Sequence, residues 1–511
     1  MGETFYITTP IYYVNDVPHI GHAYTTVAAD VAARYHRLKG EDTYFLTGTD
    51  EHGGKVAATA AEKGMEPQAW TDQISQRFRE VWPRLDISND DFIRTTEERH
   101  IKPVQAFLQH LYDKGEIYEG EYEGPYCQSC EAFYKESELV DGGCPVHKRP
   151  VERLKERNYF FRLSAHAGWL LNEYYAQNPC PVQPDSRLNE CVSFIKSGLQ
   201  DVSISRPSLE WGIPLPWNPE HVIYVWIEAL QNYITALGYP DGDKFKRYWP
   251  AVHLVGKEIV RFHAVIWPAM LHAAGVEPPK MIFGHGWLLV GGEKMSKTNL
   301  TGIHPFELVD AFGVDAYRYY FLREVAFGQD GNFSWESMEA RYTSELANGI
   351  GNLASRVVAM IGAYFDAAVP APSAPETDQD ATLREVCEAS VRDYTTAMDA
   401  LAFHQALEAV DKIVRRANGY IVETAPWVIA KDPTQRDRLA RVLFSSAETL
   451  RILAVLLSPF MPGACERLWG MLGSSSPLSH QVLPAAGEWG GLRPGSATHK
   501  GESLFPRLEQ K

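Results

Sequence analysis

The sequence predicts an α/β protein in which an insertion divides a parallel-sheet domain and an all-helical domain follows. Residues 1–115 alternate strand-like and helix-like stretches, which is typical of a parallel sheet covered by helices. Short polar turns with cysteines replace this alternation near Gly120, and the strand pattern resumes at about His221. Helical periodicity dominates from about Ser344 onward, so we expect a helical bundle there.

These changes of pattern divide the chain into parts, because 511 residues exceed what one hydrophobic core normally organises. The expected parts are a first half of the sheet domain (1–115), an insertion (116–220), a second half with a lysine loop (221–299), a mixed connector (300–345) and a helical domain (346–511).

Composition narrows the class of protein further. Hydrophobic residues make up 45% of the chain, yet no apolar run approaches a membrane span and no secretory signal precedes the first strand. We therefore expect a cytoplasmic protein without a membrane partner. Seven unevenly placed cysteines do not suggest a disulfide framework. The formal net charge of −16 argues mildly against nucleic acid, which local basic clusters and stacking would have to bind.

The first candidate site is a pair of histidines at the start of a predicted helix. Residues 4–9 predict a strand, a turn follows at Asn15–Asp16, and alanines and apolar residues then fit a helix. His19 and His22 lie at its N-terminus on one face, where backbone N–H groups and the helix dipole favour anions. Gly21 lacks a Cβ, so a flat base can approach the backbone closely.

The second candidate site is a lysine loop past the middle of the chain. Paired glycines before it favour mobility, and Lys294 and Lys297 flank Met295 and Ser296. Flexible ammonium groups suit the oxygens of a triphosphate, where catalysis is mostly positioning and neutralisation of developing charge. Each motif alone is more often a structural helix start or a solvated loop. Their joint occurrence, each in its expected context, favours a shared phosphate-handling site.

A metal-like cluster lies in the predicted insertion. Two pairs of residues, each with a two-residue gap, flank a turn at Asp141–Gly143, and they are Cys127, Cys130, Cys144 and His147. Tetrahedral zinc prefers such a set of four nitrogen and sulfur ligands. With every position filled by protein, we expect one structural Zn²⁺ that supplies folding energy. The alternatives are four ordinary residues, or a redox role for the first two cysteines.

The two phosphate motifs resemble the signatures of class I aminoacyl-tRNA synthetases, with Thr298 where serine is commoner. Other stretches narrow the resemblance to the methionyl-tRNA synthetase family, and they are residues 9–15, 47–53, 224–233 and 284–287. The cysteine cluster is similar to a single-knuckle form of that family's insertion, with His147 in place of a fourth cysteine. The resemblance covers nearly the whole chain. It implies a Rossmann-like catalytic domain, a zinc-binding insertion and an all-α anticodon-binding bundle.

The resemblance implies a slot for methionine, whose flexible apolar side chain suits aromatic walls. Trp226 and Tyr233, seven residues apart, share a helical face, although such a pair alone is more often plain core. Asp50 follows a predicted strand and is expected on the substrate's ammonium, the alternative being a turn residue. The residues expected around the side chain are Ile11, Tyr13, Trp226, Ala229, Leu230, Tyr233 and His285.

The resemblance also implies which residues handle ATP. Glu258 would meet the ribose hydroxyls or metal-bound phosphate, but a surface ion pair is nearly as common an explanation. Mg²⁺ is expected to accompany ATP. The expected catalytic residues are His19, His22, Lys294 and Lys297, and the wider ATP-binding set adds Gly21, Glu258 and Ser296.

In the helical domain, residues 351–356 and 425–427 resemble the family's anticodon readers. Asn352 and Arg356 are four residues apart on one face, and both suit hydrogen bonding to exposed base edges. Trp427, next to Pro426, suits stacking under an unstacked base, whereas the alternative is core packing beneath a loop.

Together these expectations describe a monomeric enzyme that activates L-methionine with ATP and transfers it to tRNA(Met). Three rivals differ from it in recognisable ways. Another class I synthetase that edits would need a larger insertion than 116–220. A small-molecule nucleotidyltransferase would lack the helical domain. A non-catalytic RNA-binding paralogue is disfavoured by the intact histidine and lysine motifs.

Overall fold

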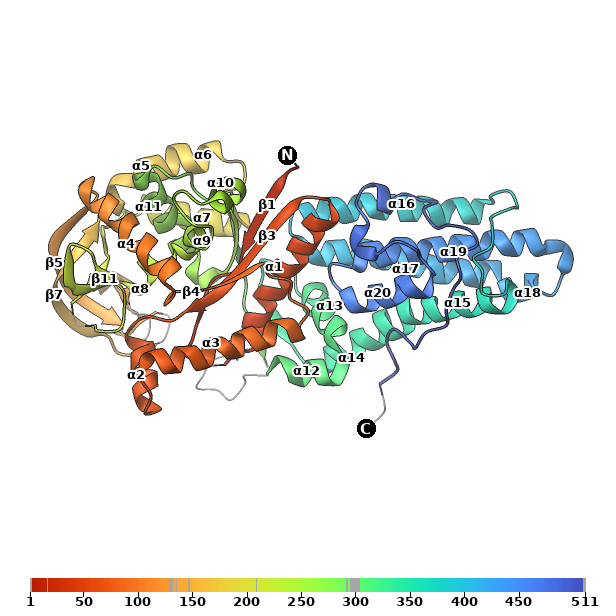
Figure 1. Ribbon diagram of the computed structural model, residues 1–511, viewed down its shortest axis with the longest axis horizontal. Helices are drawn as coiled ribbons and strands as arrows, with labels where there is room; N and C mark the ends of the chain where they lie inside the picture. Colours follow the sequence, from red (N-terminus) through yellow and green to blue (C-terminus); the bar gives the residue numbers. More distant parts are fainter. Residues whose placement is uncertain are drawn as a thin grey trace.

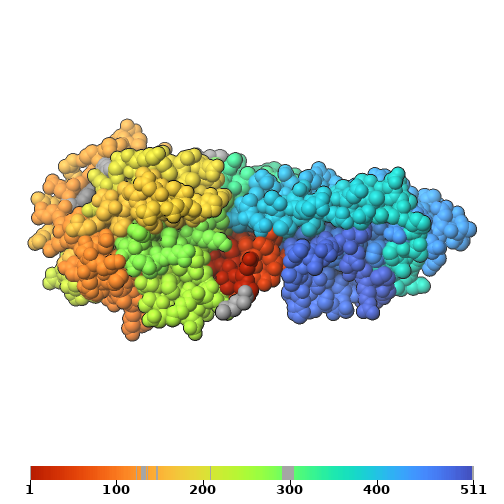
Figure 2. All heavy atoms as spheres, turned by 90° about the horizontal axis from the view of Figure 1, so that it is seen from above, coloured from red at the N-terminus to blue at the C-terminus, as the bar shows by residue number. Residues whose placement is uncertain are grey.

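The chain folds into an elongated molecule with a sheet-containing part at one end and a helical part at the other (Figure 1). The structure is a computed structural model that describes residues 2–15, 17–127, 132–134, 136–145, 148–207, 209–290, 293–294 and 304–508. Seen from above, the N-terminal strand region lies between the two parts (Figure 2). Within the described ranges, no helix is long and apolar enough to cross a membrane.

A parallel sheet forms the centre of the first part, as the alternating pattern predicted. Every strand pair in it is parallel, and the strand β2 (Tyr12–Tyr13) extends the pairing of β3 beyond the end of β1. In spatial order the other strands are β4 (Asp91–Arg94), β3 (Asp42–Asp50), β1 (Thr4–Thr8), β13 (Val252–Gly256), β14 (Met281–His285) and β8 (Val182–Gln183).

Helices cover both faces of this sheet. Side chains of β1 alternate between two apolar cores, Phe5 and Ile7 on one face and Tyr6 on the other. The longer helices of this part are α1 (Ile20–Leu38), α2 (Gly54–Glu62), α3 (Pro67–Arg84), α4 (Glu98–Asp113), α7 (Asp185–Lys196) and α11 (Trp267–Ala274). Shorter ones are α5 (Ala167–Trp169), α6 (Tyr175–Gln177) and α10 (Asp243–Tyr248).

The insertion is built on a long antiparallel ribbon of β5 (Ile117–Cys127) and β7 (Glu152–Phe161). β6 (Ala132–Phe133) and β9 (Val202–Ser203) complete this sheet, and a second small sheet contains β10 (Ser205–Arg206), β12 (Asn218–Ile223) and β11 (Pro214–Leu215).

The expected boundaries of the insertion need correction at two places. The range 116–220 also contains β8, which pairs with β14 in the central sheet. The apolar run from His221 does not continue that sheet, because β12 is antiparallel and a helix begins at Val225. A short apolar run fits either a strand or a buried helix, and here tertiary packing decides.

The connector joins the last strands of the first part to the helical bundle. β15 (Leu288–Val290) pairs with β16 (Glu293–Lys294) and β17 (Gly331–Phe333), and the connector helices are α12 (Pro305–Phe312), α13 (Val314–Glu324) and α14 (Trp335–Arg341). A π-helical stretch at Tyr342–Gly351 then leads directly into α15 (Asn352–Tyr364).

The bundle is helical from there on, as the sequence pattern predicted. Between Tyr364 and Asp378 the chain is not helical, and Pro370 and Pro372 lie in this stretch. The remaining bundle helices are α16 (Asp378–Asp399), α17 (Phe403–Thr424), α18 (Pro426–Ile429), α19 (Arg436–Leu457) and α20 (Pro462–Met471).

Helix α1 contacts both parts of the molecule. Near its C-terminal end, the Tyr35 hydroxyl donates to Asp399 of α16 at 2.9 Å. The Leu38 carbonyl accepts from the Leu483 N–H, also at 2.9 Å. Its opposite end carries the histidine motif, so one helix connects that motif with the bundle (Figure 1).

Candidate active site

The two histidines form the N-terminal end of α1. His19 is the N-cap residue, and its Nδ1 accepts a hydrogen bond from the Gly21 N–H at 3.1 Å. The Nδ1 of His22 accepts from the His19 N–H at 3.4 Å, and the rings stack with centroids 3.8 Å apart. Because each Nδ1 is an acceptor, each neutral ring carries its proton on Nε2. Two ring N–H donors at a helix N-terminus suit the oxygens of a phosphate.

Strand β2 places this motif beside a second group of side chains. Tyr12 lies next to His22, with ring centroids 4.8 Å apart. Tyr13 points the other way, since strand residues alternate, and lies edge-on to Trp226 at 6.2 Å between ring centroids. In the strand ladder, Tyr13 is the partner of Asp50. The phosphate motif, the aromatic slot and the carboxylate expected on the substrate's ammonium are therefore neighbours.

The expected side-chain slot lies along α8 (Val225–Ala229) and α9 (Asn232–Thr235). Trp226 is half-buried and stacks on Phe262 with ring centroids 4.2 Å apart. Ile11 and Tyr13 are half-buried against the same apolar core. Further slot residues, all buried, are Ala229, Leu230 and Tyr233. Most of the expected slot residues thus share one region.

His263 belongs to this region, although the sequence patterns did not single it out. Its Nδ1 faces the Ile259 carbonyl at 3.0 Å and must carry the proton, so its Nε2 accepts from the Tyr233 hydroxyl at 2.7 Å. Burial lowers the pKa of His263 to about 4, so the ring is neutral at pH 7. The Tyr233 hydroxyl is therefore held as a donor toward a neutral imidazole.

His285, the last of the expected slot residues, makes contacts with helix α1. Its Nδ1 donates to the Gly286 carbonyl, and its Nε2 accepts from the Thr25 hydroxyl of α1, both at 2.8 Å. Its ring lies edge-on to Tyr24 at 5.5 Å. His285 therefore lies on the α1 face of the sheet, and burial lowers its pKa.

Asp50 ends β3 and is 3% exposed. The next residue, Glu51, is fully buried and forms a two-pronged ion pair with Arg94 of β4, at 2.7 and 2.8 Å. The hydroxyls of Thr49 and Thr96 also donate to the Glu51 carboxylate. The backbone that carries Asp50 is thus fixed on one side by a neutralised carboxylate.

Glu258 is exposed beyond the end of β13. The Trp287 indole N–H donates to one of its carboxylate oxygens at 2.7 Å. Lys257 instead forms an ion pair with Asp330 at 2.7 Å, so the neighbouring cation does not neutralise Glu258. Among the described residues, the partner of the Glu258 carboxylate is thus an indole N–H and not a cation.

The lysine loop begins at the hairpin of β15 and β16, where Lys294 pairs with Leu289 in the ladder. β15 also pairs with β17 of the connector. Two other residues expected to handle ATP, Ser296 and Lys297, lie outside the described residues.

The expected zinc knuckle is described in part. Cys127 at the end of β5 and Cys144 are both buried, at 2% and 0% exposure. In the described chain, neither thiol belongs to the two large apolar cores. The Cys144 N–H donates to the Arg149 carbonyl, and its carbonyl accepts from the Lys148 N–H, both at 2.8 Å, which closes a tight turn. Two of the expected ligands, Cys130 and His147, lie outside the described residues.

Two of the residues expected to read an anticodon, Arg356 of α15 and Trp427 of α18, contact each other in the bundle. Asn352 is exposed at the start of α15 and Pro426 is buried at the start of α18. The Arg356 guanidinium lies 5.8 Å from the centroid of the Trp427 ring. The Trp427 side chain is 41% exposed, which excludes simple core packing. Val428 beside it is 55% exposed, so this part of the bundle presents an apolar surface.

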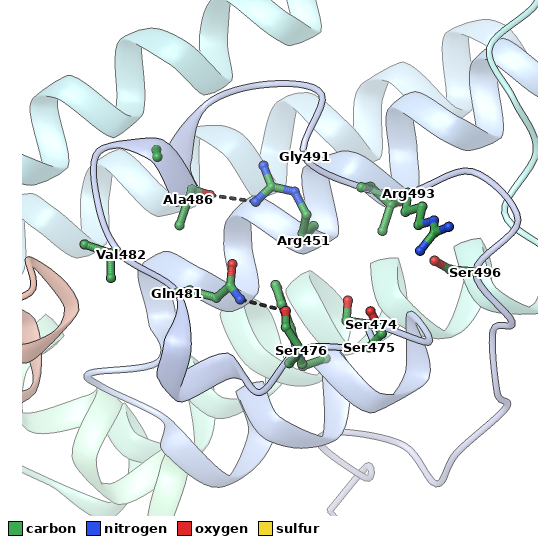
Figure 3. A pocket seen from close by; sticks show the side chains of 13 residues that line it. Arg451, Ser474, Ser475, Ser476, Gln481, Val482, Ala486, Gly491, Arg493 and Ser496 are labelled. Atoms are coloured by element: carbon green, nitrogen blue, oxygen red, sulfur yellow. Dashed lines mark hydrogen bonds between the residues drawn. The ribbon is translucent and has the colours of Figure 1, made fainter.

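A cavity of about 370 Å³ lies elsewhere in the bundle, between α19, α20 and the C-terminal segment (Figure 3). Serines and arginines line much of it, including Ser474, Ser475 and Arg493. There the Arg451 guanidinium donates a hydrogen bond to the Ala486 carbonyl at 2.6 Å. It contains none of the residues expected to act on ATP or an amino acid, so it is separate from the candidate active site.

Comparison with known proteins agrees with this geometry. The family model "tRNA synthetases class I (M)" matches residues 5–153 and 138–358. A second model, "Anticodon binding domain of methionyl tRNA ligase", matches residues 369–511. Together the two models account for both parts of the molecule.

Relatives match along the whole chain. The methionine–tRNA ligase of Streptomyces coelicolor is 53% identical over 526 residues, covering 100% of this chain and 98% of that protein. That of Caldanaerobacter subterraneus is 53% identical over 512 residues, covering 100% of this chain and 80% of that protein. The solved Mycobacterium tuberculosis methionyl-tRNA synthetase in complex with methionyl-adenylate superposes with a TM-score of 0.95 at 42% identity, covering 99% of this chain and 100% of that one. The chain therefore belongs to the methionyl-tRNA synthetase family of class I.

Proposed function

We propose that this protein acts as a methionine–tRNA ligase, converting L-methionine and ATP to methionyl-adenylate and then charging tRNA(Met). The observation that carries the proposal is the arrangement around β2. Tyr12 of this strand contacts the histidine motif, and Tyr13 contacts Trp226 and pairs with Asp50. A carboxylic acid bound between Asp50 and the aromatic slot would thus lie next to a phosphate bound at His19 and His22.

In the first step, a methionine carboxylate oxygen attacks the α-phosphorus of ATP and pyrophosphate leaves. Asp50 holds the ammonium, and Trp226 and Tyr233 hold the side chain. Negative charge grows on the phosphate oxygens, where His19 and His22 donate through Nε2 and the ammonium groups of the lysine loop add positive charge. Mg²⁺, when bound with ATP, supplies further neutralisation of phosphate charge, and the exposed carboxylate of Glu258 is the described group suited to contact it or the ribose.

In the second step, the terminal ribose hydroxyl of tRNA attacks the carbonyl of the mixed anhydride, and AMP leaves. The exposed Trp427 and the adjacent Arg356 support recognition of unstacked anticodon bases by stacking and hydrogen bonding. Asn352 contributes a further polar group on α15, and Pro426 starts the helix that carries Trp427.

One structural Zn²⁺ fits the insertion. Cys127 and Cys144 are buried thiols outside the two large apolar cores, as structural zinc ligands would be. With Cys130 and His147 they would complete a four-ligand set. Bound zinc would cross-link a small antiparallel ribbon that has little core of its own.

We also propose that the enzyme works as a cytoplasmic monomer. Over the described surface, large exposed apolar side chains are scattered, apart from Val422, Trp427 and Val428 at the tip of the bundle. That tip is the surface assigned above to tRNA, so no separate apolar patch remains for a second copy. Size-exclusion chromatography with light scattering tests this, and a stable dimer would contradict it.

Methionine-dependent exchange between ATP and pyrophosphate tests the central proposal. We expect exchange with methionine and none with leucine, isoleucine or valine. Equal exchange with leucine would indicate a different synthetase, and no exchange with any amino acid would indicate a non-catalytic protein. Charging of tRNA(Met) transcripts then tests the second step. A protein that exchanges pyrophosphate but never charges RNA would be a small-molecule nucleotidyltransferase.

A further inference from the structure

The two residues after Asp50 are each attached to a different element of the fold. Glu51 is bound by Arg94 of β4, as described above. His52 turns the other way, and its Nδ1 lies 2.8 Å from a carboxylate oxygen of Glu228 on α8. The indole N–H of Trp211 donates to the Glu51 carbonyl at 2.6 Å and covers this loop.

Glu228 is a buried junction between several elements. Its second carboxylate oxygen lies 2.9 Å from Nε2 of His100 on α4, and Nδ1 of His100 lies 2.9 Å from the Thr235 hydroxyl of α9. Glu228 and His100 have 0% exposure and His52 has 5%. One carboxylate thus connects the loop after Asp50 with α4 and with both helices of the side-chain slot.

The charge of Glu228 depends on these two imidazoles. Burial alone would raise the pKa of Glu228, but His52 and His100 more than offset this, and the pKa is lowered. A buried carboxylate costs little only while its partners remain in place. The junction is therefore rigid, because separating the loop from α8 would leave a charge unpaired.

This junction lies between two places that a bound amino acid must reach at once. The ammonium goes to Asp50 at the end of β3, and the side chain goes to the wall made by Trp226, Ala229 and Leu230 on and just after α8. Glu228 is a neighbour of these wall residues in sequence, and His52 is two residues from Asp50. The His52–Glu228 contact therefore fixes the distance between the ammonium site and the wall.

We propose that Glu228 is a positioning residue that sets the span of the amino-acid site through its bonds to His52 and His100. Glu228 touches no substrate. Its position determines how long a side chain the slot accepts when the ammonium of the amino acid is bound to Asp50. The inference rests on the proposed function, because it assumes that an amino acid occupies this slot. ATP binds on the other face of β2 and is not expected to sense the change.

The test is Glu228→Gln measured by methionine-dependent pyrophosphate exchange. An amide is neutral, and its N–H group can bind an imidazole only if that ring changes tautomer, so neither bond keeps its charged partner. We expect the KM for methionine to rise about tenfold, the typical cost of a hydrogen bond to a charged group. The KM for ATP should change less than about twofold, since its site keeps its contacts. Discrimination against norleucine and ethionine, measured as the ratio of kcat/KM values, should fall.

Glu448→Gln in the bundle is the matched control. Glu448 is also fully buried, and it is paired with Arg451 and with backbone N–H groups of Gly490 and Leu492. This variant should lower the melting temperature while leaving the KM for methionine unchanged. If Glu228→Gln does not fold, His100→Gln provides the second variant, because it keeps the His52–Glu228 contact and should raise the methionine KM by a smaller factor.

The outcomes separate this inference from the proposed function. Absence of methionine-dependent exchange in the unmodified protein would overturn the function. If the unmodified protein exchanges, an unchanged methionine KM in Glu228→Gln would overturn the inference. Equal increases in the KM for methionine and for ATP would also overturn it, because they would indicate general loosening of the fold.

Discussion

Arg318 of α13 and Asp30 of α1 form an ion pair at 2.6 Å, and both side chains have 0% exposure. The same guanidinium donates to the carbonyls of Leu85, Pro459 and Phe460. It therefore joins the sheet domain, the connector and the bundle at one point. Burial alone would raise the pKa of Asp30, but Arg318 and Arg34 more than offset this and lower it. The ion pair therefore stabilises the fold at neutral pH, and this stabilisation is lost in acid, when the Asp30 carboxylate is protonated.

Replacement of Arg318 by methionine should destabilise the whole protein. It leaves the Asp30 carboxylate buried with its main partner gone, a loss of about 3–5 kcal/mol in the free energy of unfolding. Urea titration measures this. The control is Arg34→Ala, which removes a partly exposed partner of the same carboxylate and should cost about 1 kcal/mol or less. The double variant Asp30→Asn with Arg318→Met should recover part of the loss, and a purely additive result would contradict the pairing.

The buried imidazole of His263 should make stability depend on pH. Its pKa is about 4 in the folded protein, against about 6.5 in the unfolded chain. Between these values only the unfolded chain takes up the proton, so stability is full above pH 6.5 and falls toward pH 4. The loss would reach about 3 kcal/mol. Urea titrations at pH 7.5, 6 and 5 measure it, and His263→Asn should show a flatter dependence. An equally steep variant would contradict the assignment.

Removal of the Trp427 side chain should weaken the use of tRNA but leave the activation of the amino acid unchanged. Trp427→Ala loses a stacking surface worth about 1–3 kcal/mol per base, so the KM for tRNA should rise about 5- to 150-fold. Pyrophosphate exchange should stay unchanged, because the ring lies in the bundle and is 41% exposed. Val482→Ala, at an exposed apolar side chain outside the tip of the bundle with 45% exposure, is the control and should change both by less than twofold. Wild-type charging by Trp427→Ala would argue against the anticodon assignment.

Metal analysis should find one zinc per chain. A chelator strong enough to remove it should lower the melting temperature and make the β5–β7 ribbon susceptible to protease, because the ribbon would lose its cross-link. Cys144→Ser should reproduce both effects without a chelator. Protein that contains no zinc and is unaffected by Cys144→Ser would show that the buried thiols have only a packing role.

The sequence predicted the features that depend on local pattern. The strand at residues 4–9, the helix that follows the histidines and the helical bundle all have long, regular periodicity, and all are present. β8 was missed because two residues carry no alternation, and its place in the sheet depends on β14. The place where the apolar run from His221 changes from strand to helix could not be predicted, because a short apolar run fits either.

Residues of the candidate site also differ in how far local sequence could predict their positions and partners. Asp50 ends a buried strand and could be expected at the edge of a parallel sheet. His263 could not, because it contacts Tyr233 across 30 residues and nothing local distinguishes it from a buried core histidine. His285 ends a strand, but its bond to the Thr25 hydroxyl joins residues 260 positions apart, so no local pattern could predict it. Glu228 reads as one polar residue in an apolar helix until its two imidazole partners are known.

Helix α1 has 19 residues and is therefore about 28 Å long. One end holds the histidines, and the other end is fixed to the bundle through Tyr35 and Leu38. Over that length, a tilt of about 2° displaces the histidines by about 1 Å, a misplacement that can slow a reaction about a hundredfold. A ligand that reorients the bundle thus alters the alignment of the reacting phosphate mechanically, without touching the domain in which the reaction takes place.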